Sequence, residues 1–132
     1  MSAPRKLAAL LFALFLPVAA SPLGATPVAA EGPTLEIRDF AFPTQVAIGV
    51  GESVTWVNTE QLVPHDVVSG APGGPDAGQA FASALLQPGQ AFSLPFTEVG
   101  TYEYFCSLHP GMRGIVVVSG GSTELPPAAP SE

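Results

Sequence analysis

Four side chains that bind soft metal ions lie in two short stretches of this chain. Cys106, His109 and Met112 follow the pattern C-x2-H-x2-M, and His65 lies well upstream within Pro-His-Asp. The sequence has one cysteine and two histidines, and its other methionine is Met1. Two imidazoles, a thiolate and a weak axial thioether are the ligand set of a blue-copper electron-transfer site. The pattern therefore predicts that these four side chains bind one copper ion.

The start of the chain has the pattern of a secretory signal peptide. A positive n-region precedes an apolar run at residues 7–16, and small-x-small motifs end at Ala20 and Ala30. Signal peptides are removed on export, and this apolar run is too short to span a bilayer; an uncleaved anchor is the alternative. We expect residues 1–30 to be signal peptide and leader, and the mature chain to be a soluble periplasmic protein without a membrane span.

The mature chain is strongly acidic. Without Arg5 and Lys6, only Arg38 and Arg113 oppose the eleven acidic residues, which gives a net charge of −9. About 100 residues remain, enough for one small domain with a single core, and we expect a monomer. The charge excludes nucleic acid and anionic membranes as partners. It favours redox proteins with a basic patch, approached at a salt-dependent rate.

The single cysteine strengthens the metal interpretation. An exported domain with one cysteine cannot form an internal disulfide, so Cys106 carries a free thiol in an oxidising compartment. Such a thiol is prone to oxidation, whereas a metal-bound thiolate is occupied. A buried, inert cysteine is the alternative, but the nearby His109 and Met112 favour the metal.

Short β-prone segments separated by turn signals run through the domain, with almost no helical periodicity. The expected strands cover residues 34–40, 45–50, 53–58, 65–69, 90–96, 100–105 and 113–118. Residues 79–86 fit a short helix, an irregular segment or a strand. The predicted fold class is all-β, an antiparallel β-sandwich of about eight strands. The domain spans residues 31–119, and residues 120–132 are expected to be a disordered, acidic, Pro-rich tail.

The expected elements also place the predicted ligands. Residues 106–112 connect the last two strands, and His65 begins a middle strand. Both can therefore meet at one end of the sandwich, where loops cluster. Trp56 is expected to be a core residue between the sheets rather than an electron relay, because large aromatic side chains dominate core burial.

Residues 100–114, Gly-Thr-Tyr-Glu-Tyr-Phe-Cys-Ser-Leu-His-Pro-Gly-Met-Arg-Gly, resemble the cupredoxins. The segment around His65 is similar to one of that family's middle strands, and the likeness covers roughly residues 34–119. Within the family, the two-residue gap between His109 and Met112 resembles the amicyanins, whereas plastocyanins and pseudoazurins usually have a longer gap.

The resemblance implies a Greek-key sandwich with one type 1 copper ion that alternates between Cu(I) and Cu(II). It implies that His65, Cys106 and His109 lie in a trigonal plane and that Met112 is the axial ligand. It also implies that Asn58 ties the His65 region to the loop carrying Cys106. An ordinary turn residue is the alternative role for Asn58.

Two positions depart from the resemblance. Asp66 stands where relatives usually carry Asn, and its charge favours Cu(II) unless the carboxylate points to solvent. Leu108 stands where the nearest relatives usually carry Pro, and its N–H could reach the Cys106 sulfur and raise the potential. These two effects oppose each other, so the sign of the net shift stays open.

The predicted function is an exported electron carrier between redox proteins, with a dehydrogenase or cytochrome as donor and a cytochrome or oxidase as acceptor. An apolar docking face around His109 would consist of Leu62, Pro64, Leu108 and Pro110. A copper carrier or sensor is the alternative, although it calls for an exposed, exchangeable site. An enzyme is not expected, because it would need a second metal centre or a substrate pocket. Zinc is disfavoured by the thioether.

Overall fold

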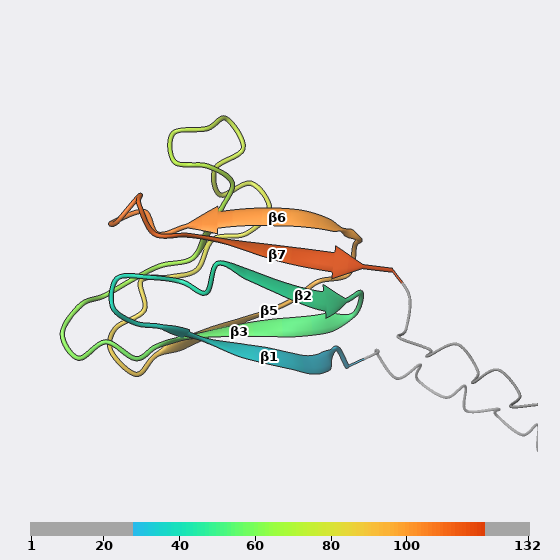
Figure 1. Ribbon diagram of the computed structural model, residues 1–132, viewed down its shortest axis with the longest axis horizontal. Helices are drawn as coiled ribbons and strands as arrows, with labels where there is room; N and C mark the ends of the chain where they lie inside the picture. Colours follow the sequence, from blue (N-terminus) through green and yellow to red (C-terminus); the bar gives the residue numbers. More distant parts are fainter. Residues whose placement is uncertain (1–27, 121–132) are drawn as a thin grey trace, which may run out of the picture.

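The computed structural model describes residues 28–120, which form two β-sheets facing each other (Figure 1). The strands are β1 (Ala30–Ile37), β2 (Gln45–Gly49), β3 (Glu52–Asn58), β4 (Val68–Ser69), β5 (Ala91–Pro95), β6 (Gly100–Phe105) and β7 (Arg113–Ser119). One sheet has the order β1-β3-β5 and the other the order β2-β7-β6-β4. The all-β sandwich is therefore confirmed, with seven strands in the described part of the chain.

The sheets are mixed, which corrects the expectation of a purely antiparallel sandwich. β3 pairs with β5, β4 with β6 and β6 with β7 in antiparallel fashion, whereas β1 pairs with β3 and β2 with β7 in parallel. The parallel pairs arise because β1 and β2 lie in different sheets, so neither can form a hairpin with the strand that follows it. Alternation within a strand reports which face is buried but not the direction of its neighbour.

Two of the expected strands differ in extent. β4 covers only Val68–Ser69, so His65 does not begin a strand as expected but precedes β4 and forms an isolated bridge to Leu86. β1 ends at Ile37, before the expected limit at Phe40, because Asp39 and Phe40 form a tight turn. Residues 79–86 are irregular and form single bridges to His65 and Val68. The predicted signal peptide and tail lie outside the described residues, except for residues 28–30 and residue 120.

The core lies between the two sheets and is centred on Trp56. Its side chain is fully buried, which confirms the expectation of a core residue. Phe92 stacks on it at 5.8 Å between ring centroids, and Tyr104 meets it edge-on at 5.3 Å. Alternate residues of β3 and β7 point into this core, as the period of a strand requires.

The segments that carry the predicted metal ligands lie at one end of the sandwich. The turn after β1, the connection after β3 and the β6–β7 loop all lie at the left end of the sandwich in Figure 1, opposite the two ends of the described chain. β6 stops at Phe105 and β7 starts at Arg113, so residues 106–112 form a short loop between paired strands. Because β6 and β7 are hydrogen-bonded to each other up to Phe105 and Arg113, both ends of this loop are held in place.

Gly114 offers a test of the packing below this loop. It pairs with Tyr104 across β6 and β7, and a Cβ at Gly114 would lie 2.4 Å from Cζ of the buried tyrosine ring. We expect Gly114→Ala to lower the free energy of unfolding of the metal-free protein by about 1–3 kcal/mol, measured by urea denaturation, because the ring must shift.

Gly111→Ala is the matched control. A Cβ there would meet no heavy atom within 4 Å, and Gly111 does not adopt a positive φ. Its effect should stay within about 0.5 kcal/mol. Equal losses in the two variants would contradict the packing argument.

Candidate metal centre

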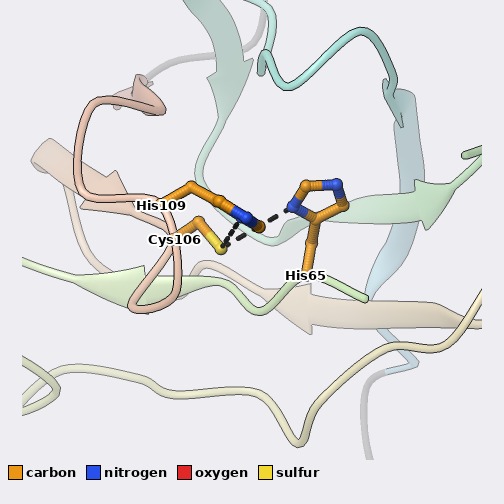
Figure 2. A group of neighbouring side chains, drawn as sticks. All are labelled: His65, Cys106 and His109. Carbon is orange, nitrogen blue, oxygen red and sulfur yellow. Dashed lines mark hydrogen bonds between the residues drawn. The ribbon is translucent and has the colours of Figure 1, made fainter. Parts of the chain in front are cut away.

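Three of the four predicted ligands meet at the loop end of the sandwich. The ligand atoms of His65, Cys106 and His109 all lie within 4.8 Å of one another. The Cys106 Sγ is 3.7 Å from Nδ1 of each histidine. In Figure 2 the sulfur faces one nitrogen of each imidazole. A trigonal ion with bonds of about 2.1 Å to nitrogen and about 2.3 Å to sulfur would hold these atoms about 3.8 Å apart. The donor set therefore has the spacing of a single metal site.

Burial is graded across the cluster. The side chains of His65 and Cys106 have no exposed surface, whereas His109 is half-buried. The backbone of His65 exchanges two hydrogen bonds with Leu86, at 3.1 and 2.7 Å, which fix the segment that carries this buried imidazole. His109 is thus the outermost imidazole of the cluster.

The β6–β7 loop fixes two of the ligands and holds Met112. His109 N donates to Cys106 O at 3.2 Å, Met112 N donates to His109 O at 2.8 Å, and Cys106 N donates to Met112 O at 3.2 Å. These three bonds close the loop on itself. Met112 is 4% exposed and belongs to the hydrophobic core cluster. The loop therefore holds the backbone of Met112 against Cys106 and His109, while its side chain is buried in the core.

Asp66 joins the two halves of the site. Its Oδ1 accepts a hydrogen bond from Ser107 N at 2.6 Å, and its Oδ2 accepts one from the Ser107 hydroxyl. Asp66 follows His65 and Ser107 follows Cys106, so this clamp ties the two ligand segments together. The carboxylate of the half-buried Asp66 is directed to Ser107, and both hydrogen bonds are exposed to solvent. Sequence reasoning found Asp66 but not Ser107, since a serine in a loop carries no signal of its partner.

Asn58 has a different role from the one that the resemblance implied. Its fully buried side chain donates to Val63 O at 2.8 Å and to Leu86 O at 2.9 Å, and its Oδ1 accepts from Glu60 N at 3.0 Å. Asn58 therefore braces the backbone around His65 against the segment before β5. The expected tie to the Cys106 loop is wrong, because Asp66 and Ser107 make that connection.

Two further residues that the sequence did not single out contact the imidazoles. The Phe40 ring lies edge-on to His65 and to His109, at centroid distances of 5.8 and 5.1 Å. Glu60 Oε1 lies 3.9 Å from His65 Nε2, which has no hydrogen-bond partner among the described residues. An orphaned ring nitrogen beside a carboxylate fits a histidine whose other nitrogen, Nδ1, faces the metal position.

Burial disfavours charge on two of the donor groups, Cys106 and His65. It raises the pKa of the Cys106 thiol, against the backbone N–H groups of Asp66, Leu108 and His109, which act to lower it. Burial also lowers the pKa of His65, as does the neighbouring His109, while Glu60 and Asp66 act to raise it. A buried neutral imidazole and a thiol that must lose its proton suit a soft metal cation.

Comparison with known proteins identifies the family. Residues 33–119 match the family described as copper binding proteins, plastocyanin/azurin family. The chain belongs to this family. Amicyanin from Paracoccus denitrificans is 41% identical over 101 residues, which cover 74% of this chain and 73% of that protein. Plastocyanin from Scenedesmus fuscus is 39% identical over 82 residues, covering 58% of this chain and 83% of that protein.

Solved structures agree with this assignment. A mutant of amicyanin in the Cu(I) form is 36% identical with a TM-score of 0.56, covering 73% of this chain and 87% of that chain. A purple cupredoxin from Nitrosopumilus maritimus is 33% identical with a TM-score of 0.59, covering 67% of this chain and all of that chain. The predicted cupredoxin family and its copper cofactor are therefore confirmed, and copper-based electron transfer is the chemistry of the family.

The shifted pKa values of His65 and Cys106 predict how the stability of the metal-free cupredoxin depends on pH. Below the ordinary histidine pKa of 6.5, the unfolded chain binds a proton at His65 that the folded chain does not, so stability falls as pH drops. Above the ordinary thiol pKa of 9.0, the unfolded chain has lost a proton that folded Cys106 keeps, so stability falls as pH rises.

The midpoint of urea unfolding, measured from below pH 6.5 to above pH 9.0, should therefore pass through a maximum between these two ordinary pKa values. Cys106→Ala is expected to flatten the alkaline side between the ordinary thiol pKa of 9.0 and the ordinary tyrosine pKa of 10.0, above which Tyr104, whose pKa burial also raises, adds its own decline. His65→Gln is expected to flatten the acidic side alone. An alkaline decline that persists unchanged in Cys106→Ala would show that another group causes it.

Proposed function

We propose that this cupredoxin is an exported carrier of single electrons, in which His65, Cys106, His109 and Met112 would hold one type 1 copper ion. The observation that carries the proposal is the position of the Cys106 sulfur, 3.7 Å from Nδ1 of both imidazoles. Membership of the plastocyanin/azurin family supports it. The bound copper would supply the one-electron chemistry as it alternates between Cu(I) and Cu(II).

The protein restrains the positions of the ligand side chains. The hydrogen bonds within the β6–β7 loop, the clamp between Asp66 and Ser107 and the Asn58 brace restrain the backbone on either side of the ligands. A site held by packing and outer hydrogen bonds keeps one geometry in both oxidation states. Little rearrangement then accompanies the arrival or departure of an electron.

The burial of the ligand side chains favours a carrier of electrons over a carrier of copper. An exchangeable copper site needs ligands that solvent and a receiving protein can reach. His65 and Cys106 are fully buried, and Met112 is nearly so. The alternative of a copper carrier or sensor is therefore the weaker one, and the proposal includes no enzymatic activity.

Export is part of the proposal. The basic n-region, the apolar run at residues 7–16 and the small-residue motifs support a cleaved signal peptide and a soluble periplasmic protein. A thiol bound to copper would also resist oxidation in that compartment. None of residues 28–120 belongs to a helix that could span a bilayer.

We further propose that electrons pass through the half-buried edge of His109 to redox proteins with a basic rim. Leu108 and Pro110, which flank His109, are exposed, and so is Leu62 in the connection after β3. These apolar side chains form a docking face, and the acidic charge of the chain would steer partners toward it. Such an encounter is small and short-lived.

The ligand assignment is tested by loading the metal-free protein with copper. One equivalent of Cu(II) should produce an intense blue colour, because charge transfer from a thiolate sulfur to Cu(II) absorbs visible light. Cys106→Ala should remain colourless, while Met112→Leu should keep the colour and change the reduction potential, since the axial ligand tunes it. A colourless copper-loaded wild-type protein would contradict the proposal.

The docking face is tested by the rate of electron transfer to a basic c-type cytochrome. Leu108→Asp should lower the second-order rate constant about tenfold, because a charge at the centre of an interface must lose its water. Val99→Asp adds the same charge at an exposed apolar position at the other end of β6 and should change the rate little. Equal rates in the two variants would contradict docking at Leu108.

A further inference from the structure

The turn between Asp39 and Phe40 is strained. Both residues have positive φ, 52° and 53°, and two hydrogen bonds between Arg38 and Ala41 close the turn. Consecutive left-handed residues are typical of type I′ turns, where Asn-Gly is the preferred pair. A phenylalanine in this region is a conformational outlier, because its Cβ crowds the backbone. Backbone outliers of this kind cluster at functional sites. The Phe40 turn is therefore expected to hold a functional side chain in place.

The turn holds an aromatic ring against both candidate copper ligands. The Phe40 ring meets His109 at 5.1 Å with an interplanar angle of 88°, and His65 at 5.8 Å with an angle of 84°. Edge-to-face packing of this kind is attractive and favours one mutual orientation of the rings. Phe40 is 52% exposed while His65 is fully buried. The ring therefore covers the imidazole pair on one side and faces solvent on the other.

Glu60 fastens the turn from inside the fold. Its Oε1 accepts a hydrogen bond from Phe40 N at 2.9 Å and lies 3.9 Å from His65 Nε2. Glu60 N in turn donates to the buried Asn58 side chain at the end of β3. Glu60 thus links the Phe40 turn to the end of β3 by hydrogen bonds, and its carboxylate lies beside the His65 imidazole.

We propose that Phe40 is a cap, a positioning residue that shields the imidazole pair from water and small anions and limits the rotation of both rings. The cap rests on the proposed function, since it takes His65 and His109 as copper ligands. It serves that function directly, because an anion or water that joined the metal in one oxidation state would force the ligands to rearrange with every electron. The strained backbone is maintained because a relaxed turn would carry the ring away from the imidazoles.

The test measures access to the copper in the full chain, with azide as the probe. In the Cu(II) protein, Phe40→Ala and Phe40→Gly should raise azide affinity about tenfold, followed by the change in the visible spectrum. Loss of copper to EDTA should accelerate in parallel. Phe40→Tyr keeps the ring and should behave like the wild type.

A second measurement separates the cap from a purely structural residue. In the metal-free protein, diethyl pyrocarbonate should modify His65 and His109 faster in both truncated variants than in Phe40→Tyr. Phe40→Gly should unfold at a temperature no lower than Phe40→Ala, because glycine accepts positive φ without strain. Faster modification in a variant that remains folded supports the cap.

Two results distinguish failure of the cap from failure of the proposed function. A wild-type protein that binds copper with a blue colour, but whose truncated variants keep wild-type azide affinity and wild-type histidine modification rates, overturns the cap alone. A wild-type protein that forms no blue copper site overturns the proposed function, and the cap with it.

Discussion

The site depends on one sulfur atom that the fold holds 3.7 Å from a ring nitrogen of each of two histidines. Cys106 and His65 come from different parts of the chain, and both are fully buried. Their side chains would not remain 3.7 Å apart by their own attraction, since a neutral thiol is a weak hydrogen-bond donor. The surrounding fold imposes the distance, so the cost of ordering the ligands is met when the chain folds.

Contacts from both sheets impose that distance. The β6–β7 loop belongs to the four-stranded sheet, and the Asp66 clamp attaches it to the segment that carries His65. The brace from Asn58 and the turn at Phe40 belong to strands of the three-stranded sheet. The site therefore lies where the two layers are fastened together, and a change in their separation would act directly on the ligands. The metal site can therefore be rigid only if the packing of the two sheets is rigid.

The ligand constellation could be predicted because Cys106 and the two histidines are so rare in this chain that few other arrangements exist. The sandwich followed from short alternating segments. The Phe40 turn could not be predicted, because its residues continue the alternation of the strand before it and lack the glycine that marks a left-handed turn. The parallel pairings and the Asp66–Ser107 clamp depend on partners distant in sequence, which no local pattern specifies.

The clamp also changes how the charge of Asp66 acts on the copper. The carboxylate accepts two hydrogen bonds from Ser107, which spread its negative charge and fix its direction. The N–H of Leu108 acts on the Cys106 sulfur and favours the thiolate. A carboxylate near bound copper would favour Cu(II), whereas N–H groups that withdraw charge from the sulfur would favour Cu(I). Both groups act at the short segment that follows Cys106, so the loop that positions the sulfur would also set the electrostatic balance around a bound ion.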